Sequence, residues 1–252
     1  MKFCVLVGHG KSKAGGYDPG AVSGKYQEFR IAKEIARYTD EYLRSLGNES
    51  VLINYDGSLY LTERIAKVNA ADFDFAVEIH LNAGGGTGTE VYHSAGNAQS
   101  KGAAQAVSAG IAGALSVRNR GAKTRLNSAG ADYFGVIRST KIPTLLIETV
   151  FIDTDDVKKV ESESGQRRCG RAIAEALSGY FDVPAQKDAA YTVKIVTDEL
   201  NVRSGPGTQY RINTTVKRGE VFTVVESSGS WGRLKSGAGW ISLNPRYAER
   251  AA

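Results

Sequence analysis

Short apolar segments recur along the first three quarters of this 252-residue chain. The segment at 2–7, KFCVLV, is apolar on both faces, which is typical of a strand in the middle of a parallel sheet. Further segments with the length and composition of strands lie at 51–54, 75–80, 89–93, 133–137 and 144–150.

Segments with helical spacing lie between these strands. At 28–46 the apolar positions recur at helical intervals, and Gly47 supplies a stop. Further helices are expected near 61–72, 98–117 and 164–181. Strands that alternate with helices predict an α/β fold, with a mostly parallel twisted sheet and helices on both faces. Such folds place their sites beyond the carboxyl ends of the strands.

The pattern changes near residue 190. The stretch at 183–190 has the composition of a linker, and the segments after it alternate between apolar and polar residues, with SGPG, KRGE and SGSWG between them. A stretch of about 60 residues with this pattern predicts a small all-β barrel. We therefore expect two domains, at 1–182 and 191–252.

The composition is that of an ordinary soluble globular protein, with 42% hydrophobic and 23% charged residues. No apolar run approaches ~18 residues, so no membrane span is expected. The N-terminus lacks the basic region, long apolar core and cleavage site of a signal peptide, which predicts synthesis in the cytoplasm without an export signal. Cys4 and Cys169 fit no metal motif and are expected to be buried free thiols.

The net charge of +5 is concentrated after residue 190, where the chain has nine Lys and Arg residues but only five Asp and Glu residues. A basic surplus favours an anionic partner. The basic residues are scattered rather than clustered, so no nucleic-acid partner is expected.

The stretch VGHGKS at 7–12 allows two interpretations. Its GKS resembles the end of a phosphate-binding loop, but that loop requires a glycine where this chain has Val5, and a helix directly afterwards. Residues 10–24 are instead rich in glycine and have no helical period. The alternative is half of a metal site, with His9 as a ligand.

Four side chains support the metal interpretation. His9 and His80 each end a predicted core strand. Glu28 opens a predicted helix, and Glu148 interrupts an apolar strand. Two imidazoles and one carboxylate match a catalytic zinc site with water in the open position, and a second carboxylate nearby can act as general base. The third histidine of the chain, His93, is expected on the solvated surface.

The segments around these residues resemble the zinc-dependent N-acetylmuramoyl-L-alanine amidases of the type 3 family. The motifs follow the family's order and cover about 2–182: GHG…YDPGAVSGKYQEFRIAKEIA, LTERIAKVNAADF, EIHLNAG, GTEVYH and FGVIRSTKIPTLLIETVFID. The resemblance implies one catalytic zinc ion with His9, Glu28 and His80 as ligands. It also implies that Glu148 is the catalytic acid/base.

The resemblance leaves several roles open. Relatives often have serine where this chain has Glu78, which we expect to orient the neighbouring histidine or to pack against it, with a ligand role as the alternative. Arg138 matches an arginine common in the family and is expected to hold a substrate carboxylate, or else to form a structural ion pair. Asn82 is expected to contact substrate. Arg64 and Asn69 also match the family and are expected to belong to the scaffold.

The second domain resembles a bacterial SH3-like domain, through LNVRSGPGTQY, KRGEVFTVVE, SWGRL and GWISLNPRY. Such domains often bind cell-wall peptide or sugar. Trp231 and Trp240 are the aromatic residues that we expect to contact the wall, and the basic surplus suggests anionic wall polymers as additional partners.

The reaction implied by the resemblance is hydrolysis of the amide bond between N-acetylmuramic acid and L-alanine in peptidoglycan, by an endolysin or autolysin. Two alternatives remain: a zinc peptidase that cuts the stem peptide or crossbridge, and a wall-binding protein without catalysis. Because no export signal is expected, such an enzyme would reach the wall through a holin-type membrane hole or after lysis.

Overall fold

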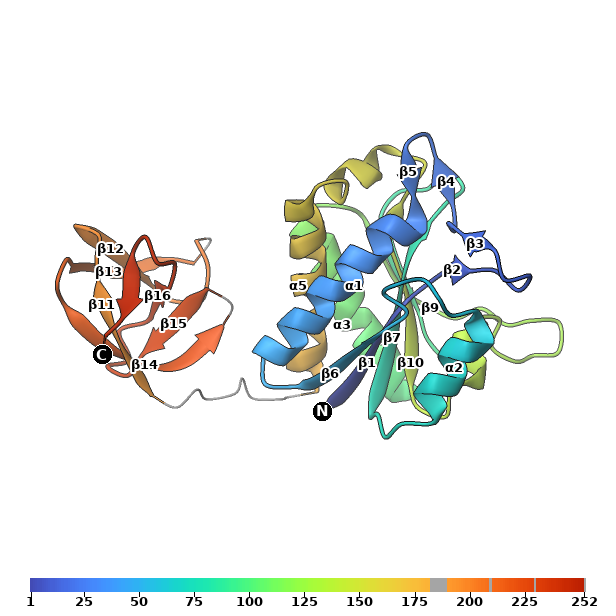
Figure 1. Cartoon of the computed structure of the whole chain (residues 1–252), viewed down its shortest axis with the longest axis horizontal. Coiled ribbons are helices and arrows are strands. Elements are labelled where there is room, and N and C mark those ends of the chain that lie inside the picture. The colour runs from blue at the N-terminus through green and yellow to red at the C-terminus, as the bar shows by residue number, and fades with distance from the viewer. Residues whose placement is uncertain (182–189, 209, 229, 252) are drawn as a thin grey trace. The chain divides into compact units, whose positions relative to one another are not determined.

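The structure, a computed structural model, describes residues 1–181, 190–208, 210–228 and 230–251. They form two compact units, one with the elements up to α5 and one with those from β11 to β17 (Figure 1). The predicted linker at 183–190 lies, except for Ala190, outside the described residues. No helix in these described ranges is long and apolar enough to cross a membrane.

The first unit is built on a six-stranded sheet with the order β6-β1-β7-β10-β8-β9 (Figure 1). Its strands are β1 (Lys2–Val7), β6 (Glu49–Ile53), β7 (Phe75–Asn82), β8 (Thr89–Tyr92), β9 (Asn119–Lys123) and β10 (Thr144–Phe151). The β8–β10 pair is antiparallel, and the other neighbours are parallel. The central strands are buried on both faces, which is why β1 reads as a continuous apolar run.

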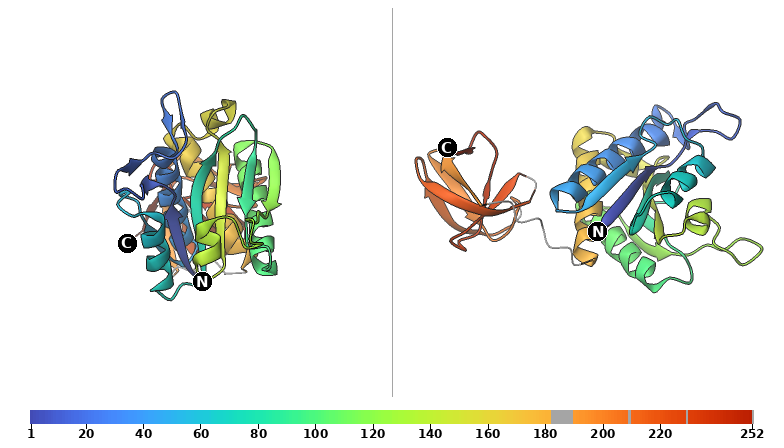
Figure 2. Two further views of the ribbon diagram at one scale, coloured as in Figure 1. Left: turned by 90° about the vertical axis from the view of Figure 1, so that its right-hand side faces the viewer. Right: turned by 60° about the horizontal axis from the view of Figure 1, so that its bottom comes forward.

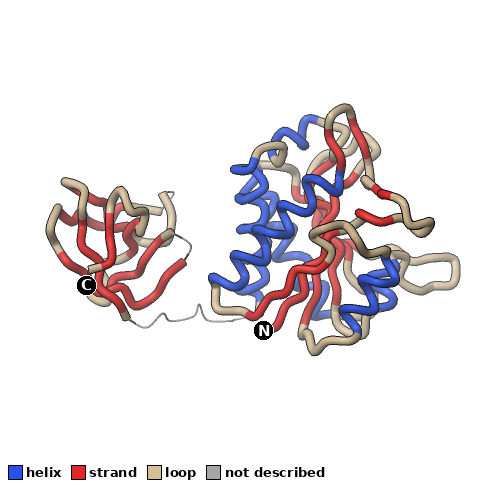
Figure 3. Tube along the Cα trace, viewed as in Figure 1, coloured by secondary structure: helices blue, strands red, loops and turns tan. Residues whose placement is uncertain are grey.

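Helices cover both faces of this sheet (Figures 1 and 3). Three long helices lie on one face: α1 (Glu28–Ser45), α3 (Ala98–Leu115) and α5 (Glu163–Tyr180). Two short helices, α2 (Leu61–Asn69) and α4 (Gly135–Ser139), lie on the other, and Figure 2 shows these layers from two further directions. The fold is therefore the predicted α/β architecture.

The face that carries α2 also carries the candidate site. Cys4 and Leu6 of β1 and Ala76 of β7 pack there against Val68 of α2. Because side chains alternate along a strand, Glu78 and His80 lie on the same face as Ala76. A short 3-10 helix, η1 (Asp155–Lys159), follows β10.

Two small hairpins occupy the glycine-rich segment before α1. In the first, β2 (Gly10–Lys11) pairs with β3 (Tyr17–Asp18). In the second, β4 (Val22–Ser23) pairs with β5 (Tyr26–Gln27). They carry the chain from the end of β1 to the start of α1.

The strand predicted at 133–137 is wrong. Gly135–Ser139 forms α4, and its Val136 and Ile137 pack against Leu146 of β10. A short apolar run fits a buried helix as well as a strand, and the tertiary contacts decide. The burial of Cys4 and Cys169 as free thiols is confirmed.

The second unit is a seven-stranded antiparallel sheet with the order β13-β12-β16-β15-β14-β11-β17. Its strands are β11 (Tyr191–Ile195), β12 (Glu199–Arg203), β13 (Ile212–Lys217), β14 (Val221–Ser228), β15 (Trp231–Leu234), β16 (Trp240–Ser242) and β17 (Ala248–Arg250). Val202, Val224 and Ile241 are among the residues of its own buried core. The all-β prediction is confirmed.

Candidate active site and metal centre

His9 lies just beyond β1, in a backbone conformation that few non-glycine residues adopt. Its φ is 63°. The Asn54 side chain supports this turn, because Nδ2 donates to the carbonyl oxygens of Val7 (2.9 Å) and His9 (2.8 Å). The ring is fixed by Asp18 of the first hairpin, whose Oδ2 lies 3.0 Å from Nδ1. The Nε2 atom of His9 is thereby turned toward Glu28.

Glu28 is the first residue of α1 and is buried. Its Oε2 accepts a hydrogen bond from the backbone N–H of Ala21 (2.8 Å), and its Oε1 accepts one from that of Leu81 (3.1 Å). A helix N-terminus also favours a negative charge. The carboxylate is therefore held at the end of β7 by groups from three segments.

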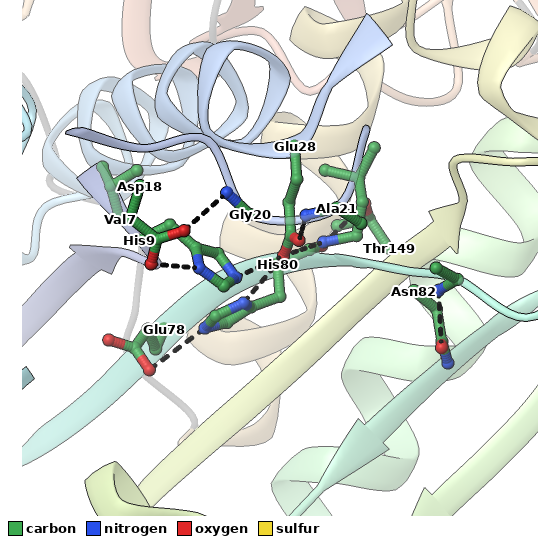
Figure 4. Close-up of polar contacts among 12 residues, drawn as sticks. Val7, His9, Asp18, Gly20, Ala21, Glu28, Glu78, His80, Asn82 and Thr149 are labelled. Atoms are coloured by element: carbon green, nitrogen blue, oxygen red, sulfur yellow. Dashed lines mark hydrogen bonds and ion pairs between the residues drawn. The ribbon is translucent and has the colours of Figure 1, made fainter. Parts of the chain in front are cut away.

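The two histidines and Glu28 converge on one point (Figure 4). Glu28 Oε1 lies 3.1 Å from His9 Nε2 and 2.8 Å from His80 Nδ1. One ligand atom from each of the three residues lies within 4.8 Å of the ligand atoms of the other two. These residues can therefore hold a metal ion. Three protein ligands of this kind leave one position open, as catalytic zinc sites require.

The His80 ring is closely packed. A Cβ atom on Gly8 would lie 2.2 Å from its Cε1, so only glycine fits beside it. Its Nε2 lies 3.2 Å from Oε2 of Glu78, on the side of the ring away from Glu28 (Figure 4). The structure thus places Glu78 where it can orient the ring.

The pKa values show that the group is suited to a cation. Burial opposes charge on Glu28, but hydrogen bonds from His80 and His9 hold its pKa far below the ordinary value. Burial likewise opposes charge on His80, yet Glu28 and Glu78 raise its pKa well above normal. The pKa of His9 is raised in the same way, mainly by Glu28. Carboxylates therefore dominate the field around the two rings.

Glu148 of β10 stands beside His80 in the register of the parallel β7–β10 pair. Its Oε2 is shielded from solvent and has no hydrogen-bond partner among the described residues. Burial raises the pKa of Glu148 to about 7. The nearby His80 lowers this pKa, and the charges of Glu28 and Glu90 raise it further. A carboxyl group with this pKa can both take and give a proton near neutral pH.

Asn82 of β7 and Glu90 of β8 form a partly buried contact near Glu148, which pairs with Glu90 in the β8–β10 ladder. Asn82 Nδ2 donates to Glu90 Oε1 at 2.9 Å, and Glu90 also accepts hydrogen bonds from Tyr92 and Arg120. The amide of Asn82 is therefore engaged with the protein in this structure, and its substrate contact stays a prediction.

A cavity of about 230 Å³ lies beside the metal group. Apolar residues from α2, α4 and β10 form one wall: Leu61, Phe134, Val136 and Leu146. Lys11 lines the cavity as well, and its Nζ lies 3.0 Å from Glu63 Oε2.

The surroundings of His93 differ from the prediction, whereas Arg138 forms backbone contacts and its substrate role stays a prediction. His93 is buried, not solvated, because β9 pairs beside it and the His93 N–H donates to the Lys123 carbonyl oxygen (3.0 Å). Arg138 donates through Nη1 to the backbone oxygens of Asp132 (2.7 Å) and Tyr133 (2.8 Å). Arg138 forms no ion pair with the described residues. Its structural role there is to hold these two backbone oxygens.

Three residues of the site were missed in the sequence. Asp18, Asn54 and Glu90 each contact a predicted site residue and were not predicted as part of the site. The YDPG turn and the acid in the short segment TEVYH were the available signals. Neither signal indicates which side chain it serves.

Trp231 lines a groove of about 260 Å³ in the second unit. Tyr247 lines the groove as well. Its polar lining residues include Glu199, Asn201, Thr208 and Ser242. Trp231 is 9% exposed, so little of its side chain is open to the groove. Trp240 is half-buried and does not line it.

Comparison with known proteins agrees with this geometry. The sequence profile of the N-acetylmuramoyl-L-alanine amidase family matches residues 4–179, and that of the bacterial SH3 domain matches 198–245. The N-acetylmuramoyl-L-alanine amidase CwlM of Bacillus licheniformis is 32% identical over 200 residues, which are 77% of this chain and 74% of that protein. The endolysin of Bacillus phage SPP1 is 32% identical over 147 residues, which are 56% of this chain and 53% of the endolysin.

Solved structures show the same relationship. An N-acetylmuramoyl-L-alanine amidase from Clostridium difficile 630 matches with a TM-score of 0.62 and 27% identity, over 72% of this chain and 98% of that one. The chain therefore belongs to the N-acetylmuramoyl-L-alanine amidase family, whose members cleave the amide bond between N-acetylmuramic acid and L-alanine in peptidoglycan.

Proposed function

We propose that this amidase binds one catalytic zinc ion through His9, Glu28 and His80, and that Glu148 is its acid/base. The observation that carries the proposal is the convergence of three ligand atoms near Glu148, whose buried Oε2 has no hydrogen-bond partner among the described residues. The donor set fits zinc, which prefers imidazole nitrogen and carboxylate oxygen in catalytic sites. The family match supports the same assignment.

Each residue has a distinct part in the reaction. When bound, zinc supplies Lewis-acid polarisation of the scissile carbonyl and lowers the pKa of water toward about 7. Glu148 accepts a proton from the attacking water and then delivers it to the leaving nitrogen of L-alanine. Asp18 and Glu78 keep the two imidazole rings in place while this happens.

The cavity beside the metal group is our candidate for the substrate-binding region. Its apolar wall suits the methyl groups of the lactyl unit and of L-alanine. Arg138 uses only Nη1 in its hydrogen bonds to described residues, so its other nitrogens are free to meet a carboxylate of the stem peptide. Arg138 and Asn82 remain proposed substrate contacts.

We propose that the second unit binds the wall through the groove beside Trp231. Aromatic side chains beside neutral polar groups and the charged Glu199 and Arg203 together suit a peptide or sugar ligand. Tyr247→Ala removes an exposed wall of this groove and is expected to reduce sedimentation with purified walls. The control is Tyr210→Ala, since Tyr210 is similarly exposed but does not line the groove. Equal loss in both variants would contradict this assignment.

The site of action is the bacterial cell wall. The similarity to a phage endolysin supports a lytic role in which the enzyme reaches peptidoglycan after release from the cell that made it.

Metal analysis tests the zinc site. We expect one zinc ion per chain, loss of activity on chelation and recovery when zinc is added. His80→Ala is expected to lose the metal. Full zinc occupancy in His80→Ala would show that His80 is not a ligand.

A further inference from the structure

One buried arginine contacts both segments that carry the histidines. Arg64 of α2 is 4% exposed. Its Nε donates to Glu78 Oε1 at 2.9 Å, and its Nη1 donates to the carbonyl oxygens of His9 (3.1 Å) and Leu59 (3.0 Å). Arg64 therefore joins the end of β1 to the middle of β7.

Glu78 extends this connection to the second histidine. It is 1% exposed, and its other oxygen, Oε2, faces Nε2 of His80. The attraction within a buried ion pair is largely offset by the desolvation of both charges, so such a pair is weak evidence for a role in stability. A role in the site explains better why Arg64 and Glu78 are placed here.

The hydrogen bonds fix which nitrogen of each ring carries a proton once a metal is bound. Both ring nitrogens of His80 face carboxylates, which only accept, so without a metal each nitrogen would carry a proton. A metal bound beside Glu28 would replace the proton on Nδ1, while Glu78 keeps the one on Nε2. On His9 the arrangement is reversed, because Asp18 holds the proton on Nδ1 and Nε2 is the nitrogen that faces Glu28. The two histidines thus offer different ring nitrogens to the same point.

We propose that Arg64 and Glu78 are a positioning pair that fixes His80 as its Nε2–H tautomer, with Nδ1 of His80 and Nε2 of His9 as the metal-binding nitrogens. The inference rests on the proposed zinc site. Glu78 is then neither ligand nor base, because both of its oxygens are engaged and it faces the ring nitrogen away from Glu28. Gly8 supports the pair, since its lack of a side chain lets the ring lie flat against the end of β1.

Histidine tautomers in the zinc-loaded full chain test the proposal directly. Long-range proton–nitrogen correlation spectra of ¹⁵N-labelled protein are tractable because the chain has three histidines. We expect an Nε2–H tautomer at His80 and an Nδ1–H tautomer at His9. An Nδ1–H tautomer at His80 would overturn the inference. If the wild type takes up no zinc at all, the zinc site itself fails instead.

Zinc affinity in variants of the pair provides a second test. Competition with a chromophoric chelator is expected to show about 10–100-fold weaker binding for Glu78→Gln. This variant and Arg64→Met each leave one buried charge unpaired, so both are expected to lower Tm. The double variant removes both charges, and we expect its Tm to recover while its zinc affinity stays weak.

A purely structural pair gives a different pattern. Zinc affinity in the double variant within about twofold of wild type would overturn the positioning role. Asp40→Asn is the matched control, because Asp40 is also buried and pairs with Arg44 but touches no proposed ligand. It is expected to lower Tm without changing the zinc affinity.

Discussion

Glu148 differs from the other carboxylates of the site in its surroundings. Glu28 and Glu78 are each held in the charged form by nearby donors. Glu148 has a buried oxygen that no described residue contacts as a donor, and its pKa is raised to about 7. When environments push neighbouring pKa values apart, they separate the roles of chemically identical groups. Glu28 thus suits a permanently ionised ligand, and Glu148 suits a proton carrier.

The first prediction concerns turnover. Glu148→Gln keeps the shape of the side chain but cannot exchange a proton, so kcat is expected to fall by ~10²–10⁴. The zinc content should stay near one per chain, because Glu148 is not among the three converging residues. Wall lysis at a near wild-type rate would show that another group is the base.

The second prediction concerns stability and pH. The pKa of Glu148 is about 7 in the folded chain against an ordinary value of 4.5. Between these values the folded state binds more protons than the unfolded state, so stability is lost as pH rises. Glu148→Gln has no titrating carboxyl group at this position, so it does not lose this stability as pH rises. In chelator-treated protein the variant should gain up to about 3 kcal/mol relative to wild type at pH 8, and little at pH 4.

Thermal unfolding of both proteins across this pH range provides the measurement. A Tm difference that does not change with pH would show that Glu148 titrates normally in the folded chain.

The central residues of the site could be predicted because strand ends meet at one edge of a parallel sheet. His9, His80 and Glu148 are all carried by neighbouring strands. Asp18 could not be found in this way, because its contact with His9 depends on the β2–β3 hairpin, which has no clear signal in a glycine-rich segment.

At the scale of the element, the end of β1 and β7 fit together closely. The Gly8 N–H donates to the Ile79 carbonyl oxygen (3.1 Å), and the Gly8 Cα faces the His80 ring. The strand end thus sets the position of one proposed ligand through backbone contact, while His9 follows directly in the turn.

The third prediction tests this fit. Gly8→Ala places a Cβ 2.2–2.7 Å from three ring atoms of His80, so the ring or the strand must move. We expect weaker zinc binding and a stability loss of about 1–3 kcal/mol, as overpacking typically causes. Calorimetric zinc titration and thermal unfolding measure the two effects.

Gly16→Ala is the control for this substitution. A Cβ on Gly16 would meet only Ser12 Oγ, at the ordinary distance of 3.7 Å. Zinc binding by Gly8→Ala as tight as that of Gly16→Ala would contradict the packing argument.

Most elements could be predicted from periodicity, and the failures have physical causes. In β9, NRGAK lacks apolar alternation, because this edge strand is only partly buried. In α4, tertiary packing against β10 selects a helix for a run that is too short to show a period.

At the scale of the whole molecule, the two units differ in which candidate catalytic and metal-binding residues they contain. The first contains His9, Glu28, His80 and Glu148, and residues 191–252 contain no histidine or cysteine. Each unit has its own buried core. This division supports catalysis by the first unit and wall binding by the second.

The fourth prediction follows from this division. A fragment of residues 1–185 should fold, bind zinc and cut soluble muropeptide, but act weakly on whole walls. A fragment of residues 188–252 should sediment with walls without cutting them, and less so at high salt if its positive charge contributes. The intact chain should exceed the mixed fragments, because tethering raises the local enzyme concentration.

Pull-downs and turbidity assays with each fragment provide the measurement. If 188–252 stays in the supernatant while 1–185 sediments and lyses walls fully, the binding role of the second unit is wrong.

The bond that is cut tests the account most directly. Purified peptidoglycan is digested with wild-type enzyme and with Glu148→Gln, and the products are identified by mass spectrometry. We predict that the wild type releases intact stem peptides with free L-alanine amino termini and leaves glycan strands without peptide, while Glu148→Gln releases almost none. Cleavage within the stem peptide or crossbridge, with the bond to N-acetylmuramic acid intact, would contradict the account.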